Sequence, residues 1–436
     1  ERMSLSFDSA RIHAGYNPQE HNNAVSVPIY QTVSYNFKDT DHATRLFSFQ
    51  EAGWLYSRVT NPTVHTLELR AAALDGASAA LAVASGMAAI SYALLNAAEG
   101  GKVLSSPYLY GGSADSFSRI YKPLGIEIVQ TADTLDPEKL DLLIDDSVKA
   151  VFVESISNPS GVVADIEGLS AVTKKHGVAL IVDNTFATPY LLRPFEHGAD
   201  IVVYSSTKAY SGHGNAISGL ILESGKFPYG NGRYPQFTQP EYVLRDRNTQ
   251  QEGNFFEYFG PEAFTSRARL VYLNYFGAAL GPFDAYLALV GVETLSERVQ
   301  KQSDSALKIV RHLESSPNVS FVSHPYQAGN PQADLVKKYL PKGGGAVLAF
   351  GFKGTVEQSE KFINSLELFS YHVNVGDVRS LVSNTAKTTH SELNPELQSE
   401  AGIYPETIRL SIGLEDPGDL IADLEQAFAK AFESSK

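Results

Sequence analysis

The chain has 436 residues, a net charge of −14, no basic run and no cysteine. The length predicts two or three domains; the acidic balance argues against a nucleic-acid partner, and the absence of cysteine excludes disulfides, thiolate metal sites and a cysteine nucleophile. No run of about 18 apolar residues predicts a membrane span, and the first residues do not resemble a secretory signal, so we expect a cytoplasmic protein without a membrane partner.

Residues 1–62 show little regular periodicity and form a predicted N-terminal arm. An arm with this many aromatic residues should bury them against another part of the assembly, and we expect this to be a second subunit. Tyr56 and Arg58 are two apart, so they lie on one side of an extended segment, where a phenol and a guanidinium together suit a phosphate. From the spacing alone, a surface turn is the better interpretation.

A helix is predicted from Asn61 to Gly76, followed by a short apolar segment, 79–84, that is either a strand or a helix. The turn Ser85-Gly86-Met87 then opens an apolar helix. Free backbone N–H groups and the positive end of the helix dipole bind anions at such a turn. The alternative is a tight strand-to-helix connection capped by the serine.

Alternating strands and helices follow this turn. Strands are predicted at 102–106, 126–129, 150–154, 178–184 and 217–222, with helices at 137–144 and 169–176 and a further one after the turn 110–113. This alternation predicts an α/β fold with a mainly parallel sheet covered by helices on both faces. No Gly-x-Gly-x-x-Gly follows the first strand, so a dinucleotide-binding fold gains no support.

The stretch from Ala199 to Lys208 carries the most informative pattern. An apolar, β-branched run ends in Ser205, Ser206 and Thr207, and then in Lys208. A buried parallel strand has this pattern, and its carboxyl end is where open α/β sheets bind ligands. A desolvated lysine loses its proton more easily and can form a Schiff base. Together with hydroxyls for a phosphate, this suggests pyridoxal phosphate; from this stretch alone, a surface lysine is the better interpretation.

Other predicted strands also carry polar groups. Asp183 ends a buried strand, where a carboxylate needs a cation such as a protonated pyridine nitrogen; capping the next residues is the alternative. Tyr110 offers a ring face and a phenol, or is a core aromatic. Arg409 lies in an alternating apolar strand. This indicates either a buried carboxylate partner, such as that of a substrate, or an edge strand whose arginine reaches solvent. His213 has no second ligand at helical spacing, so we expect no metal site.

The second half begins with a long irregular insertion, 225–259. Helices are predicted at 267–289, 294–313, 356–366 and 418–432, and strands at 319–322, 346–350, 371–375 and 407–412. We therefore expect three parts, which are the arm (1–62), a cofactor-binding domain (63–290) and a smaller α+β C-terminal domain (291–436).

Three long motifs resemble a known family. They are Asp183-Asn184-Thr185-Phe186-Ala187-Thr188-Pro189, Ser205-Ser206-Thr207-Lys208, and Gly212-His213-Gly214. They are similar to those of the Cys/Met-metabolism pyridoxal-phosphate enzymes, which have the aspartate-aminotransferase fold (fold type I). The resemblance extends from His13-Ala14-Gly15 to the segment 409–415, almost the whole chain.

The resemblance implies a role for each matching residue. Lys208 would hold the aldehyde of pyridoxal 5′-phosphate as a Schiff base, Asp183 would pair with the pyridine nitrogen, and Tyr110 would stack on the ring and shuttle a proton. The residues that would bind the phosphate are Ser85, Gly86, Met87, Ser205 and Thr207, and Tyr56 and Arg58 would complete that site from a neighbouring subunit. Asn158 would contact the cofactor's phenolic oxygen and the substrate carboxylate. Ser380 and Arg409 would also bind the substrate carboxylate. Sites shared in this way imply a homo-oligomer, which we expect to be a tetramer.

Within the family, two features favour the O-acetylhomoserine sulfhydrylase branch. The turn Tyr110-Gly111-Gly112-Ser113 resembles its Tyr-Gly-Gly-Thr, and the insertion 225–259 is long, as in that branch. Two features depart from the pattern, since Met87 replaces a usual glutamine and 383–387 replaces Ile-His-Pro-Ala-Ser. We expect γ-replacement on O-acetylhomoserine by sulfide or methanethiol. The alternatives are γ-elimination of the methionine γ-lyase type, a cystathionine-type reaction, and a cofactor-binding regulatory protein without turnover.

Overall fold

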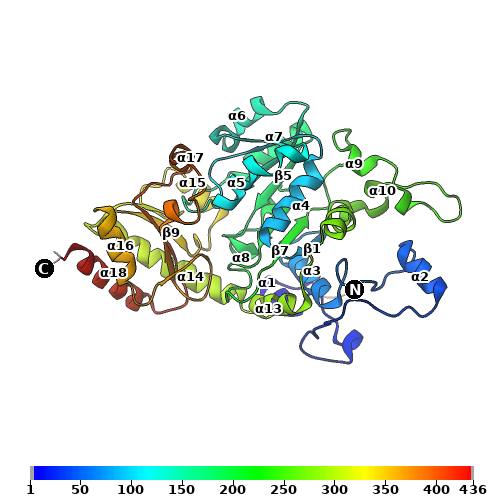
Figure 1. Ribbon diagram of the computed structural model, residues 1–436, viewed down its shortest axis with the longest axis horizontal. Coiled ribbons are helices and arrows are strands. Elements are labelled where there is room, and N and C mark those ends of the chain that lie inside the picture. Colours follow the sequence, from blue (N-terminus) through cyan, green and yellow to red (C-terminus); the bar gives the residue numbers. More distant parts are fainter. Residues whose placement is uncertain (1–3, 434–436) are drawn as a thin grey trace.

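The computed structural model describes residues 4–433 and contains two separate sheets (Figure 1). The larger sheet has the order β1-β7-β6-β5-β4-β2-β3. Its strands are β1 (Ala79–Val83), β2 (Lys102–Ser105), β3 (Glu127–Gln130), β4 (Val148–Glu154), β5 (Ala179–Asp183), β6 (Ile201–Ser205) and β7 (Gly219–Glu223). Only β7 runs against its neighbours. The predicted mainly parallel sheet is therefore confirmed, and segment 79–84 is a strand.

Helices cover both faces of this sheet. Successive residues of a strand point to opposite sides, so apolar side chains of the same strand pack against helices on each face. Val151 and Val153 of β4 pack in one cluster with α3 (Pro62–Asp75), α7 (Ile166–His176) and α13 (Pro282–Val292). Phe152 packs in another with α4 (Gly86–Ala98), α5 (Gly111–Arg119) and α11 (Ala263–Arg267). The shorter helices of this half are α6 (Pro137–Leu143), α8 (Thr188–Leu191), α9 (Pro235–Thr238), α10 (Phe255–Phe259) and α12 (Asn274–Phe276).

The smaller sheet lies toward the C-terminus and has the order β10-β11-β12-β9-β8. Its strands are β8 (Val319–Ser323), β9 (Val347–Phe352), β10 (Ser370–Tyr371), β11 (Leu381–Ser383) and β12 (Thr407–Ser411). Three amphipathic helices, α14 (Leu295–Glu314), α16 (Val356–Ser365) and α18 (Pro417–Phe432), bury their apolar faces against it. The helices α15 (Ala333–Tyr339) and α17 (Pro395–Glu400) complete this half.

Two predicted elements of the second half are wrong. The helix at 267–289 is broken, because Gly277 adopts a left-handed conformation (φ 80°) that ends α12, and Pro282 starts α13. The strand at 371–375 ends at Tyr371, and the following residues form the wall of a cavity. The predicted domain limits remain predictions; the second one falls inside α13.

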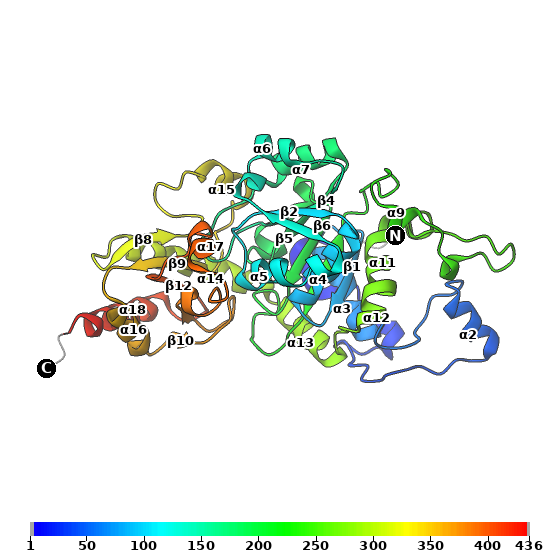
Figure 2. The same cartoon turned by 45° about the horizontal axis from the view of Figure 1, so that its top comes forward.

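The N-terminal arm and the 225–259 insertion project on the same side of the molecule (Figure 2). The arm contains α1 (Phe7–His13) and α2 (Thr40–Phe47), and its Phe49 ring packs against Phe259, with a centroid distance of 6.1 Å. Several apolar side chains of the arm are exposed in this single chain, including Val25 (93%) and Phe47 (60%). Within residues 4–433, no helix combines the length and apolar character needed to cross a membrane.

Candidate active site

A cavity of about 240 Å³ opens where β4, β5 and β6 end, facing the segment 373–375 and strand β12 of the smaller sheet. Its lining residues are Ser85, Gly86, Met87, Ile90, Tyr110, Glu154, Ile156, Asn158, Asp183, Thr185, Phe186, Ser205, Thr207, Lys208, Ile217, Val373, Asn374, Val375, Thr389 and Arg409. The fold thus gathers ten predicted site residues from distant parts of the chain, as expected for strand ends of a parallel sheet.

Lys208 lies in the turn after β6, partly buried in this cavity. Its Nζ donates a hydrogen bond to Asn374 Oδ1 at 3.1 Å. Burial, and secondly the positive charge of Arg409, lower the pKa of Lys208 from 10.5 to about 8. The lysine is therefore desolvated, as the sequence predicted, and a substantial fraction is the neutral nucleophile near neutral pH.

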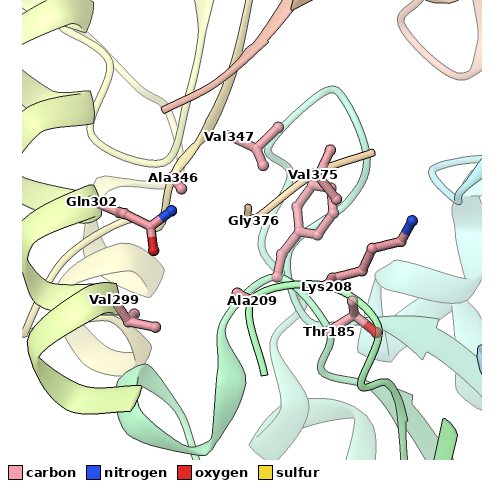
Figure 3. Close-up of a pocket in the computed structure, with 10 residues that line it drawn as sticks. Thr185, Lys208, Ala209, Val299, Gln302, Ala346, Val347, Val375 and Gly376 are labelled. Carbon is pink, nitrogen blue, oxygen red and sulfur yellow. The ribbon is translucent and has the colours of Figure 1, made fainter. Parts of the chain in front are cut away.

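A second, very small cavity of about 10 Å³ borders the other side of this lysine (Figure 3). Gln302 and Val299 of α14 line it, and the Lys208 side chain points away from them. α14 thus supports the chain just behind the lysine. Its Arg298 reinforces this by donating to the carbonyl oxygens of Ala209 (2.8 Å) and Tyr210 (3.2 Å).

Two buried carboxyl groups stand side by side at the ends of adjacent strands. Asp183 ends β5, Glu154 ends β4, and the two residues are paired in the sheet register. Asp183 Oδ1 accepts hydrogen bonds from the backbone N–H of Thr185 (3.1 Å) and from its hydroxyl (2.5 Å), so the predicted capping alternative also holds. Burial raises the pKa of Asp183 to about 6, and no basic side chain among residues 4–433 offsets it. A cationic ring nitrogen would supply that missing partner.

The N-terminus of α4 forms one end of the cavity. Ser85 Oγ accepts from Ala88 N–H (3.0 Å), so the serine cap exists, while the first N–H groups of the helix have no intrahelical acceptor. A Cβ on Gly86 would lie 2.5 Å from Ser205 Cβ, so only glycine allows this close approach. The Thr207 hydroxyl donates to Ser218 O (3.2 Å) and accepts from Ser218 N (3.0 Å). This end suits an anion.

Arg409 is a buried cation that has no carboxylate partner among residues 4–433. β12 lies between β11 and β9, so the edge-strand alternative is wrong, and the residue is only 2% exposed. Its guanidinium donates to Asn158 Oδ1 (3.0 Å) and to the Asn374 carbonyl (3.2 Å), while its Nε has no partner. Burial lowers the pKa of Arg409 to about 10. A substrate carboxylate would satisfy this group.

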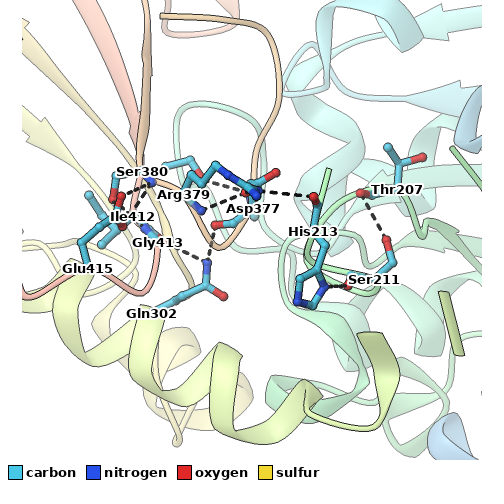
Figure 4. A network of polar contacts seen from close by, with 12 residues as sticks. Thr207, Ser211, His213, Gln302, Asp377, Arg379, Ser380, Ile412, Gly413 and Glu415 are labelled. Atoms are coloured by element: carbon cyan, nitrogen blue, oxygen red, sulfur yellow. Dashed lines mark hydrogen bonds and ion pairs between the residues drawn. The ribbon is translucent and has the colours of Figure 1, made fainter. Parts of the chain in front are cut away.

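Tyr110 is 36% exposed and lines the cavity, so it is not a core aromatic. Three other predicted residues lie outside the cavity. Tyr56 and Arg58 belong to the arm, with the Arg58 guanidinium 4.9 Å from the Tyr56 ring centroid. Ser380 lies in a polar network at the edge of the smaller sheet (Figure 4), where its hydroxyl donates to Glu415 (2.9 Å) and accepts from Gly413 N–H (2.8 Å). A substrate-binding role for Ser380 stays a prediction.

The sequence reasoning missed Glu154, Asn374, Thr185 and Thr389. A signal existed for Glu154, because it ends a buried strand in the same way as Asp183 does. None existed for Asn374, since its segment has the alternation of a strand.

The donor set of the cavity fits pyridoxal phosphate. A desolvated amine (Lys208) suits its aldehyde, and the α4 N-terminus suits its phosphate. The buried Asp183 carboxyl group, which no basic side chain of residues 4–433 offsets, suits its ring nitrogen. No part of this fit depends on the two arm residues of the same chain.

Comparisons with known proteins agree with this fit. Residues 8–429 match the family model of the Cys/Met metabolism PLP-dependent enzymes. The chain is 44% identical to O-acetyl-L-homoserine sulfhydrylase 1 of Thermus thermophilus over 427 residues (98% of this chain and 100% of that protein). It is 42% identical to homocysteine synthase of Schizosaccharomyces pombe (98% of each). A Campylobacter jejuni crystal structure, described as an O-acetylhomoserine (thiol)-lyase with N′-pyridoxyl-lysine-5′-monophosphate, superposes with a TM-score of 0.92 at 39% identity (98% of this chain and 100% of that one).

Proposed function

Because the chain belongs to the Cys/Met-metabolism family of pyridoxal-phosphate-dependent enzymes, we propose that it replaces the acetoxy group of O-acetyl-L-homoserine with sulfide or methanethiol. The products are acetate and L-homocysteine, or L-methionine with methanethiol. The observation that carries the proposal is the meeting of Lys208, Asp183 and Arg409 in one cavity. Relatives named O-acetyl-L-homoserine sulfhydrylase, similar over their full length, support the choice of substrate.

Each cavity residue has a role that follows from the chemistry of its side chain. Bound pyridoxal phosphate supplies an electron sink for negative charge that develops at the substrate Cα. When the cofactor is bound, Asp183 would hold a proton at the ring nitrogen, and Tyr110 would offer its ring face. Arg409, supported by Asn158 Oδ1, binds the substrate carboxylate and so orients Cα.

Lys208 attaches the cofactor and then moves protons. Its lowered pKa leaves about a tenth of the amine neutral at pH 7, so Nζ would accept the Cα proton once the substrate amine has taken its place. After Nζ has released that proton to solvent, it would take a second proton from Cβ. The C–O bond at Cγ breaks, acetate leaves with the electron pair, and HS⁻ or the thiolate forms the new C–S bond at Cγ. Return of the two protons to Cβ and Cα completes the replacement. Asn374, which accepts a hydrogen bond from Nζ, keeps the lysine within the cavity.

The assembly proposed for this enzyme is a cytoplasmic homotetramer with shared sites. In it, Tyr56 and Arg58 of one subunit complete the phosphate site of another. Two observations support this arrangement. The Arg58 guanidinium lies over the Tyr56 ring and outside the cavity of its own chain. The arm that carries both residues exposes apolar side chains that a second subunit would cover.

Product analysis with O-acetyl-L-homoserine, with and without sulfide, tests the proposal. Homocysteine and acetate formed only with sulfide support replacement. Formation of 2-oxobutyrate at similar rates in both tubes would identify a γ-elimination lyase. A yellow protein that makes neither product would refute the substrate assignment. Lys208→Ala should abolish turnover and the cofactor's lysine-bound absorbance, whereas Lys226→Ala, at an exposed lysine outside the cavity, should change neither.

A further inference from the structure

We propose that Glu154 is a positioning residue whose two carboxyl oxygens tie the backbone of Tyr110 to that of Asn158 at the wall of the cavity. The proposal rests on the proposed function of this site and adds to it a residue that holds two others in place. In this role Glu154 makes the ring-facing part and the carboxylate-binding part of the site a single rigid unit.

The hydrogen bonds of Glu154 carry the argument. Oε2 accepts from the N–H of Tyr110 at 2.6 Å, and Oε1 accepts from the N–H of Asn158 at 3.2 Å. Tyr110 lies 44 residues away along the chain, so the first bond joins two separate loops. Glu154 is 7% exposed and lines the cavity, so little water competes for either oxygen.

The two backbone amides that Glu154 accepts from belong to Tyr110 and Asn158, and the side chains of both residues line the cavity. Tyr110 is the N-cap of α5, and its side chain makes no capping bond within residues 4–433, while Glu154 accepts its backbone N–H at the start of that helix. The Oδ1 atom of Asn158 accepts from Arg409 Nη1 at 3.0 Å. Movement of Glu154 would therefore shift the ring face and loosen the arginine together.

Burying the Glu154 carboxyl group beside Asp183 costs free energy, which indicates that its two oxygen atoms have a specific role. Glu154 stands beside Asp183, and burial together with that neighbour raises the pKa of Glu154 well above the usual value. A neutral residue would avoid this cost. However, a glutamine presents one oxygen and one NH₂ group, and the NH₂ group cannot accept a backbone N–H. An ionised carboxyl group offers two strong acceptor oxygens, and a protonated one keeps its carbonyl oxygen as a strong acceptor and its hydroxyl oxygen as a weaker one.

Glu154→Gln tests the proposal, with Glu127→Gln as the matched control at an exposed site on β3. Hydrogen exchange of the holoenzyme should become about tenfold faster at the Tyr110 or the Asn158 amide, since one of them loses its acceptor. The visible circular dichroism band of the bound cofactor should change because the ring contact moves. The KM for O-acetyl-L-homoserine should rise about tenfold through the loosened Asn158–Arg409 contact. The control should leave all three unchanged.

A purely structural role predicts a different result, in which the melting temperature falls while amide exchange, dichroism and KM stay as in the wild type. That result in folded Glu154→Gln protein would overturn the proposal. Should this variant not fold, Glu154→Asp carries the test, because its shorter side chain reaches one amide at most and the same three changes are expected. Exchange and dichroism need no substrate, so they test the role of Glu154 even where O-acetyl-L-homoserine is not turned over.

Discussion

The protonation of Lys208 gives the most direct test of how the cavity works. The pKa of this lysine is lowered from 10.5 to about 8, with burial as the larger cause and the charge of Arg409 as the second. At pH 7 about a tenth of the amine is then neutral, against about 0.03% for an exposed lysine. The cavity therefore increases the reactive fraction about 300-fold, which corresponds to the difference between the two pKa values.

The assay is the reaction of cofactor-free protein with pyridoxal 5′-phosphate between pH 6 and pH 10, followed by absorbance. Nα-acetyl-lysine is measured under the same conditions, and its rate is expressed per neutral amine. Dividing the protein rate by this reference rate removes the effect of the cofactor's own ionisation on the pH dependence. The corrected rate should rise about tenfold per pH unit up to about pH 8 and then level off. Arg409→Met should move this bend upward but keep it below pH 10.5, because burial remains.

A matched substitution at an exposed arginine, Arg119→Met, should leave the bend where it is. A rate that keeps rising to pH 10 in the wild type would show that Lys208 is solvated as an ordinary lysine. A bend that Arg409→Met does not move would show that the two charges do not interact. Either result would refute the electrostatic reasoning.

Three further substitutions have defined outcomes. Asp183→Asn should lower kcat on the order of 100-fold while the protein still folds, because a neutral amide does not stabilise a proton on the ring nitrogen; steady-state rates and a melting curve check this. Arg409→Lys should raise the KM for O-acetyl-L-homoserine at least about tenfold with a smaller effect on kcat, since lysine lacks the planar fork that also reaches Asn158; unchanged KM would exclude carboxylate binding here. Gly86→Ala should destabilise the protein by about 1–3 kcal/mol and weaken cofactor retention, because the new methyl group meets Ser205; thermal melts and dialysis measure the two effects.

The strand ends were the part of the site that the sequence predicted well. The apolar runs before Asp183 and Lys208 have the composition of buried parallel strands, and the carboxyl ends of such strands share one edge of the sheet. Both side chains accordingly meet in the cavity. The sequence does not decide whether Arg409 is buried, because an alternating strand has the same pattern at the edge and in the middle of a sheet. Only its pairing with β9 and β11 decides the question.

Local patterns failed where long-range contacts decide the backbone. The segment 371–375 alternates like a strand, yet after Tyr371 it leaves the sheet, and Asn374 then contacts Lys208 through its side chain and Arg409 through its carbonyl. In 267–289 the apolar periodicity continues across Gly277 and Pro282, and the local turn chemistry of these two residues overrides it. The proposed role of Glu154 depends on a bond to Tyr110 that no local pattern contains.

The tight contact between Gly86 and Ser205 separates the site into two parts with different tolerance to change. At that end the backbones of α4 and β6 touch, so a single added carbon requires the scaffold to move. Ile217, Val373 and Thr389 also line the cavity, and all three lie on loops, where a replaced side chain does not require the scaffold to move. Replacements at these three positions should therefore cost less stability than a replacement at Gly86, where the scaffold itself has to move.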